Sequence, residues 1–220
     1  LQAQKKVDLD PFKFSVQLRT LPAMVIDSSY HTYNVLVETT KMNQALLTEM
    51  TPENTVILKG WRKLSTNGHM TISVKLEDIL PESVSIKERT QTSKDKKGNV
   101  TTKTFYYEQV QYSFGANAVI NDYTGAHIMD QPLANRQHKL VYNSPEFAFK
   151  PLAQGYFAIN AISLTKELYR RGVSNAMHYL SDRLTDNFGF DEVTLTDQMW
   201  IVDSRKHPEY DAHRNAFQKA

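Results

Sequence analysis

Residues 101–120, TTKTFYYEQVQYSFGANAVI, form the longest alternating pattern in the chain. From Tyr106 onward the even positions are mostly apolar and the odd positions mostly polar. Successive side chains of a strand point to opposite faces of a sheet, so the alternation predicts a strand with one buried and one wetter face. The side chains expected to be buried are Tyr106, Val110, Tyr112, Phe114, Ala116, Ala118 and Ile120.

A polar run precedes this strand and completes a predicted hairpin. Residues 95–99, Asp-Lys-Lys-Gly-Asn, lie near the middle of the run and are typical of a turn. Together the run and the strand predict a long β-hairpin over residues 83–114. We expect its base to be buried and its tip to stand in water.

Other stretches of the first two thirds of the chain also alternate like strands. They cover residues 12–19, 30–40, 55–64 and 70–76, and shorter strands are expected at 126–129 and 138–142. Asn67-Gly68 is a strong hairpin signal and predicts antiparallel pairing of the two strands that flank it. Many short strands separated by turns predict an antiparallel β-sandwich-like domain with one long protruding hairpin.

The last third of the chain has helical periodicity. Residues 163–187 carry apolar side chains at three- and four-residue steps. Gly172 leaves open whether this is one helix or two, because a glycine inside a helix costs about 1 kcal/mol relative to alanine. A last helix is expected over residues 208–220, with Pro208 in its first turn.

These patterns predict an α+β protein with three parts. Residues 1–10 are expected to be a flexible N-terminal leader, and residues 11–148 the antiparallel β domain. Residues 149–220 are expected to be a mainly helical segment, the truncated start of a further helical domain.

Composition excludes several classes of protein. The net charge of +2 gives no global reason to expect nucleic acid as a partner. No apolar run approaches the roughly 20 residues of a transmembrane helix. The absence of cysteine excludes disulfides, thiol catalysis and cysteine-ligated metal sites. The opening residues, LQAQKKVDLDP, are compatible with signal-peptide removal, so we expect an extracytoplasmic location.

A basic arm is the first candidate binding site. Residues 87–104 hold six basic and two acidic side chains, a net charge of +4. The simpler interpretation is a solvated hairpin tip whose lysines discourage edge-to-edge pairing. The alternative is an anionic partner, such as a polysaccharide or a lipid headgroup. The candidate residues are Lys87, Arg89, Lys94, Lys96, Lys97 and Lys103.

Three consecutive aromatic residues, Phe105, Tyr106 and Tyr107, are the second candidate. In a strand they must face both ways, so at least one ring is expected to be exposed near the base of the arm. Exposed rings can stack on the apolar face of a sugar or mark a protein interface. The alternative is ordinary cross-strand packing, since aromatic residues favour strands.

Chemistry-bearing motifs are not found in the sequence. The seven histidines are scattered without metal-ligand spacing, and there is no G-x-S-x-G, glycine-rich phosphate loop or H-E-x-x-H. We therefore expect no catalytic residue, no metal and no cofactor.

The last helical pattern, residues 207–217, is similar to the opening helices of tetratricopeptide-like arrays, with Ala212, Ala216 and Phe217 as interface residues. In this respect the chain resembles uncharacterised exported envelope proteins of Gram-negative bacteria, which join an N-terminal β domain to helical repeats. The resemblance implies a non-enzymatic, extracytoplasmic binding or assembly module whose partner is a protein or polysaccharide of the envelope. Two alternatives stay open: a carbohydrate-binding module that uses exposed aromatics, and an envelope hydrolase without a recognisable motif.

Overall fold

The computed structural model describes residues 9–202 and 205–218, which fall into two compact units. The larger unit is Pro22–Gly189, and the smaller joins Leu1–Leu21 to Phe190–Ala220. Strands and helices occur in both, so the predicted α+β class is confirmed. The boundary expected at residue 148 does not coincide with the division between these units, because residues 149–189 belong to the larger one.

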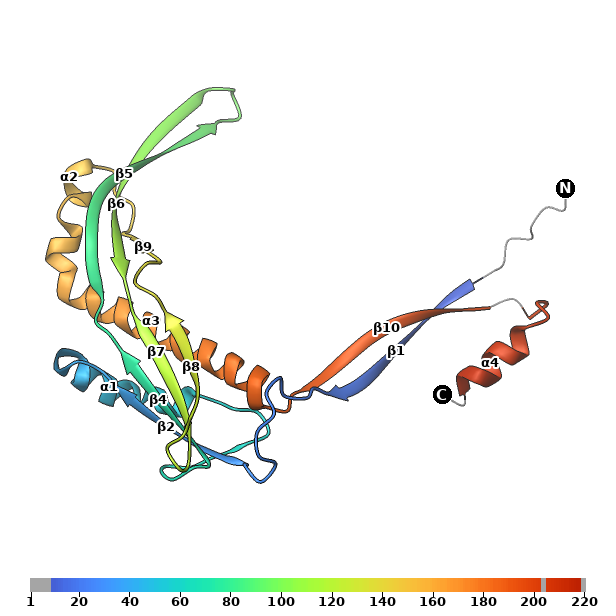
Figure 1. Ribbon diagram of the computed structural model, residues 1–220. Helices are drawn as coiled ribbons and strands as arrows, with labels where there is room; N and C mark the ends of the chain where they lie inside the picture. The colour runs from blue at the N-terminus through green and yellow to red at the C-terminus, as the bar shows by residue number, and fades with distance from the viewer. Residues whose placement is uncertain (1–8, 203–204, 219–220) are drawn as a thin grey trace. The chain divides into compact units, whose positions relative to one another are not determined.

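A long antiparallel ladder forms the centre of the larger unit (Figure 1). One side consists of β4 (Met70–Leu76) and β5 (Leu80–Lys94), and the other of β6 (Val100–Ser113) and β7 (Ala116–Asp122). Pairing runs from Met70 opposite Asp122 to Lys94 opposite Val100. The hairpin predicted over residues 83–114 is confirmed, and it is the outer part of this longer ladder.

The ladder belongs to two sheets in turn. Its inner part lies in a five-stranded sheet of order β3-β2-β4-β7-β8, with β3 at Arg62–Lys63, β2 at Thr32–Glu38 and β8 at His127–Ala134. Its outer part lies in a three-stranded sheet of order β5-β6-β9, with β9 at Leu140–Asn143. The alternation predicted from Val110 to Ile120 is confirmed, since all the even positions in that range are buried.

One pairing corrects the expected all-antiparallel arrangement. Strand β2 runs parallel to both β3 and β4 and lies between them. Asn67-Gly68 therefore carries the chain across β2 and is not a hairpin turn. The strand expected over residues 70–76 is present, whereas that expected over residues 55–64 is reduced to Arg62–Lys63. The local pattern does not specify that β2 is inserted between the two strands.

Helix α3 (Tyr156–Phe188) lies across one face of both sheets and supplies much of the core. The main layers are thus helix on sheet, and not the expected sheet-on-sheet sandwich. Gly172 does not divide the helix: a Cβ there would lie 3.1 Å from the Phe114 ring, so glycine allows close helix–strand packing. This unit also contains four short helices, which are η1 (Lys41–Asn43), α1 (Gln44–Met50), η2 (Pro52–Thr55) and α2 (Lys150–Ala153).

The smaller unit is a two-stranded ribbon with one helix. Strand β1 (Leu9–Arg19) pairs antiparallel with β10 (Glu192–Val202), and α4 (Tyr210–Gln218) follows. The strand begins inside the expected leader 1–10, of which residues 1–8 lie outside the described residues. The Val16 and Leu18 side chains are exposed, because a two-stranded ribbon has no second layer. The side chain of Phe217 also lies outside the described residues.

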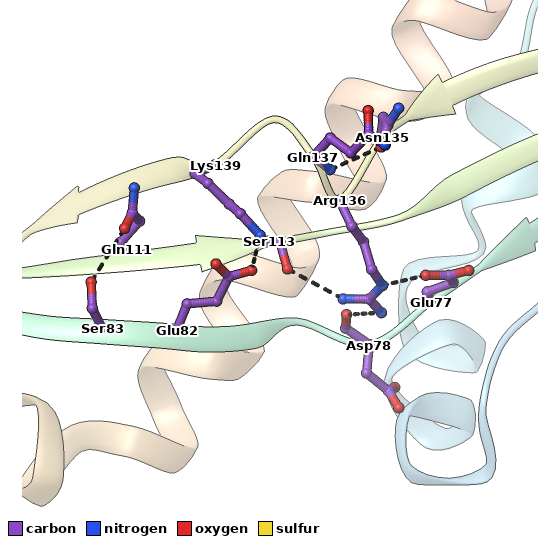
Figure 2. A network of polar contacts seen from close by, with 10 residues as sticks. All are labelled: Glu77, Asp78, Glu82, Ser83, Gln111, Ser113, Asn135, Arg136, Gln137 and Lys139. Carbon is purple, nitrogen blue, oxygen red and sulfur yellow. Dashed lines mark hydrogen bonds and ion pairs between the residues drawn. The ribbon is translucent and has the colours of Figure 1, made fainter.

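Arg136 fastens the junction between the two sheets (Figure 2). It lies in the turn between β8 and β9 and donates hydrogen bonds to the Glu77 carboxylate, to the Asp78 carbonyl oxygen at 2.9 Å and to the Ser113 hydroxyl. Nearby, Lys139 pairs with Glu82. These contacts hold the β8–β9 turn to both sides of the ladder where it changes sheets.

The Glu82–Lys139 pair predicts a pH dependence of stability. The pKa of Glu82 lies below its ordinary value of 4.5, mainly because Lys139 and then Ser113 donate hydrogen bonds to it. A lowered folded-state pKa stabilises the fold above the unfolded value and loses that contribution as the pH falls through the folded value. We expect Glu82→Gln to melt below wild type at neutral pH, and the difference to shrink as the pH falls below the ordinary value of 4.5. Thermal melts across this range test it, with exposed Glu88→Gln as the control, and an unchanged difference in acid would contradict it.

The outer arm is expected to be dispensable for folding. Residues 87–103 are exposed, and Gln91 faces Lys103 across the hairpin. Replacing residues 92–102 with Asn-Gly should give a two-residue turn and change the free energy of unfolding by less than about 1 kcal/mol. Denaturant unfolding measures the change. A loss of cooperative unfolding would show instead that the arm is required for the fold.

Candidate functional site

A polar pocket of about 510 Å³ lies at one end of the five-stranded sheet. Strands β2 and β4 are parallel, so both begin at this end, and antiparallel β7 finishes there. Tyr33, Met70 and Asp122 are aligned across the three strands. The loops that precede β2 and β4 and the turn after β7 therefore meet. They line the pocket with Asp27, Ser29, Tyr30, Asn67, Gly68, His69, Thr71 and Tyr123.

The first loop presents Asp27 and Tyr30 through a tight turn. The backbone N–H of Ser29 donates to Asp27 Oδ1 at 2.8 Å, and the N–H of Tyr30 donates to the Asp27 carbonyl oxygen at 3.0 Å. Aspartate favours such turns because its short side chain accepts a hydrogen bond two residues onward. The turn fixes the carboxylate and the tyrosine ring relative to each other.

The second loop is held by Asn34, a buried side chain of β2. Its Oδ1 atom accepts hydrogen bonds from the Gly68 N–H at 2.9 Å and from the Thr71 hydroxyl at 3.0 Å. Asn67 adopts φ = 56°, a left-handed conformation that asparagine tolerates better than most residues. The sequence Asn67-Gly68 thus forms the pocket floor, because its backbone can pass close to β2.

The third loop is the turn between β7 and β8. Asp122 Oδ1 accepts hydrogen bonds from the backbone N–H groups of Thr124 and Ala126, at 2.8 and 2.9 Å. Tyr123 stands on this turn with 66% of its surface exposed. Its ring is therefore available for contact with a ligand.

The aromatic rings of the three loops lie close together. The Tyr30 and His69 rings are nearly parallel, at 11° with centroids 5.5 Å apart. The Tyr123 ring meets Tyr30 edge-on, at 81° and 5.8 Å. The pocket wall is therefore built from flat, partly apolar surfaces with polar groups at their edges.

Hydrogen bonds fix the tautomer of His69. Its Nδ1 atom lies 3.0 Å from both the backbone nitrogen of His31 and the Thr32 hydroxyl oxygen. The His31 N–H can only donate. The Thr32 hydroxyl oxygen also accepts a hydrogen bond from the backbone N–H of His69 at 3.1 Å. Because Nδ1 is an acceptor, the neutral imidazole carries its proton on Nε2 and offers a donor there.

The Asp27 carboxylate lines the pocket, and the Asp122 carboxylate lies near it, close enough for its charge to act on Tyr30. The backbone N–H of Ser29, followed by its hydroxyl, lowers the pKa of Asp27. The Thr124 hydroxyl does the same to the pKa of Asp122. Burial, and then the charge of Asp122, raises the pKa of Tyr30. The site thus combines an ionised acceptor, an uncharged phenol and an imidazole donor.

Two further hollows, one of about 340 Å³ and one of about 400 Å³, are both lined by Arg136. The guanidinium group that would recognise an anion there already donates to Glu77, Asp78 and Ser113. These hollows are therefore less suited to a ligand than the aromatic pocket.

The predicted basic residues are spread over the arm. Lys87, Arg89 and Lys103 share one face, Lys94 lies on the other, and Lys96 and Lys97 occupy the turn. Arg89 is engaged by Glu146, which accepts two hydrogen bonds of 2.7 Å from it. The solvated tip is confirmed by its exposure, and a binding role of the lysines stays a prediction.

The three consecutive aromatics are half-buried, so the ring expected to be exposed is not found. The Arg89 guanidinium lies 5.5 Å from the centre of the Phe105 ring. The backbone of Tyr106 exchanges two hydrogen bonds of 2.8 Å with Phe147. Cross-strand packing accounts for this cluster, and the aromatic residues suited to a ligand lie in the pocket instead.

The pocket residues were not predicted from the sequence. The available signal was that both turn motifs, Asn67-Gly68 and residues 121–125, carry a ring next to the turn, His69 and Tyr123. Each motif is ordinary alone, and only the strand order brings them together. Among the described residues, no cluster of His, Asp and Glu side chains could hold a metal ion, and no helix could cross a membrane.

Comparisons with known proteins are sparse. No protein-family profile matches the chain, and no curated protein matches it. A solved structure of a neuraminyllactose-binding hemagglutinin homolog from Helicobacter pylori matches 73% of this chain and 97% of that chain, with 11% identity and a TM-score of 0.31. At this TM-score the similarity supports no conclusion about fold or function. The resemblance to exported envelope proteins stays a prediction.

Gly68 should be required for the pocket floor. A Cβ at this position would lie 2.6 Å from backbone atoms of Tyr33, which cannot move aside cheaply. We expect Gly68→Ala to lower the free energy of unfolding by about 1–3 kcal/mol, as overpacking commonly does. Gly125→Asn is the control, since nothing lies within 4 Å there and asparagine tolerates its φ of +87°. Equal effects in denaturant unfolding would contradict the steric argument.

Proposed function

We propose that the chain is a non-enzymatic binding module that recognises a saccharide in the pocket between Tyr30, His69 and Tyr123. The observation that carries the proposal is the meeting of flat rings with fixed polar groups in one hollow. The pocket volume of about 510 Å³ lies within the range of roughly 300–1,000 Å³ usual for small-ligand sites.

Sugar chemistry matches these groups. A pyranose ring has an apolar C–H face, which packs on an aromatic ring, and hydroxyl groups at its edge. A hydroxyl group can donate to the Asp27 carboxylate while its oxygen accepts from His69 Nε2–H. Hydrogen bonds to an ionised acceptor are the stronger ones, at about 1.5–3 kcal/mol each. Exposed Tyr123 provides the stacking surface.

The charge of the pocket favours neutral saccharides. Asp27 and Asp122 are held ionised by hydrogen bonds from Ser29 and Thr124. A carboxylated or sulfated sugar would meet two like charges, and like charges that are juxtaposed disfavour binding. We therefore expect neutral hexoses to bind better than acidic ones.

The proposal includes an extracytoplasmic location and a polysaccharide of the cell envelope as the partner, because structural polysaccharides lie outside the cytoplasm. The lysines of the arm would contribute through acidic groups of the same polymer, at a distance from the pocket. Cell fractionation with an antibody to the chain tests the location. Recovery in the cytoplasm would contradict it.

Binding to an array of neutral and acidic glycans tests the function. Calorimetric titration of the strongest neutral glycan should then give a Kd that rises at least tenfold in Tyr123→Ala and in Asp27→Asn. The physical reasons are the loss of the stacking ring and of the ionised acceptor. Tyr179→Ala is the matched control, because this exposed tyrosine lies on α3, which contributes no residue to the pocket.

Two outcomes would overturn the proposal. One is binding of no neutral glycan by the wild-type chain. The other is binding that Tyr123→Ala leaves unchanged. Release of new reducing ends from the bound glycan would support the hydrolase hypothesis and contradict the non-enzymatic one.

A further inference from the structure

The turn and helix start after β9 expose an unusual amount of apolar surface. Phe149, Leu152, Ile159 and Ile162 are 68%, 60%, 85% and 78% exposed. All four fall within one short stretch that contains α2 and the first turns of α3. Scattered single apolar residues are normal at a surface, but a concentration of large ones marks an interaction site.

The same stretch lacks negative charge. Between Glu146 and Lys166 the only charged residue is Lys150. The carboxylates that flank the stretch are already engaged, Glu146 by Arg89 at 2.7 Å and Glu167 by Arg171 at 2.9 Å. Among the described residues, Lys150 and Lys166 form no ion pair. The stretch thus combines exposed apolar side chains with two lysines, Lys150 and Lys166, whose charges are not paired with a carboxylate in the described part of the chain.

The exposed isoleucines of α3 and Lys166 lie on the same face of this helix. Ile159 and Ile162 are three residues apart, and Lys166 follows four residues later, so the three side chains lie along one face of the helix. A basic residue beside exposed apolar ones is the arrangement of interfacial helices, which bury their apolar face at the headgroup level and attract anionic lipids.

We propose that residues 149–166 dock on the surface of a lipid bilayer that contains anionic phospholipid. Phe149, Leu152, Ile159 and Ile162 enter the boundary between headgroups and acyl chains, and Lys150 and Lys166 contact lipid phosphates. The charge complementarity favours this partner over a second copy of the chain, in which the same lysines would face each other.

The docking stretch is separate from the saccharide pocket. The Glu108 side chain of β6 accepts a hydrogen bond from the Phe157 N–H and so fixes the start of α3 beside that strand. The pocket lies beside Asp122, further along the ladder, and none of its lining residues falls within residues 149–166. The two surfaces can therefore be tested independently.

Vesicle sedimentation with the whole chain tests the docking. We expect binding to phosphatidylcholine vesicles with 30% phosphatidylglycerol to be at least tenfold stronger than to pure phosphatidylcholine, and to weaken with salt. The double variant Ile159→Asp and Ile162→Asp should lose at least tenfold in binding. The matched control is Ile57→Asp, since Ile57 is 59% exposed elsewhere in the same unit.

A second pair of variants separates charge from apolar contact. Lys150→Glu with Lys166→Glu, both at exposed positions, should abolish the preference for phosphatidylglycerol and the salt dependence. Thermal melts verify that each variant folds. Absence of wild-type vesicle binding would overturn the proposal. So would a wild-type dimer that Ile159→Asp with Ile162→Asp converts to monomer without any effect on vesicle binding.

Discussion

The antiparallel ladder from Met70–Asp122 to Lys94–Val100 is the constraint on which the larger unit depends. Its two sides pass together from the five-stranded to the three-stranded sheet at Glu77 and Gly115, where the Glu77 N–H donates to the Gly115 carbonyl oxygen at 2.9 Å. A Cβ at Gly115 would lie 2.3 Å from the Glu77 carboxylate, so a larger residue there would require that side chain to move. The Glu77 carboxylate also forms an ion pair with Arg136.

The position of the pocket follows from this ladder and from one parallel pairing. Because β2 lies parallel to β4, the loops before both strands emerge at the same end of the sheet, and the antiparallel pairing of β4 with β7 adds the turn at Tyr123. The opposite end of the ladder is paired only with itself and stands in water. The fold therefore creates a built hollow at one end and an open arm at the other.

The sequence predicted the elements better than their arrangement. Alternation identified the even positions from Val110 to Ile120 as buried, because the period of two depends only on local geometry. The insertion of β2 between β3 and β4 depends on contacts between distant residues, which no local pattern contains. Gly172 was ambiguous for a related reason, since its role is to admit Phe114 of another element.

The candidate sites show the same difference between what a local pattern reveals and what depends on contacts between distant residues. The arm could be recognised because a charged run with a turn has no place in a core. For Phe105 to Tyr107 both ligand contact and cross-strand packing stayed open, because partners such as Arg89 and the backbone of Phe147 cannot be read from the sequence. The pocket was missed because its aromatic and acidic groups come from three separate loops.

Asn34 links the stability of the core to the shape of the pocket. It is 3% exposed, and a buried polar group is costly unless it is hydrogen-bonded. Its Oδ1 atom meets this requirement by accepting from Gly68 and Thr71, and the same two bonds hold the pocket floor. An apolar residue of similar volume would leave the buried Gly68 N–H without that acceptor, so packing alone does not explain an asparagine at this position. The buried Asn34 side chain therefore also holds the loop that carries His69, so His69 lies beside Tyr30 before any ligand binds. Such preorganisation lowers the entropy lost on binding.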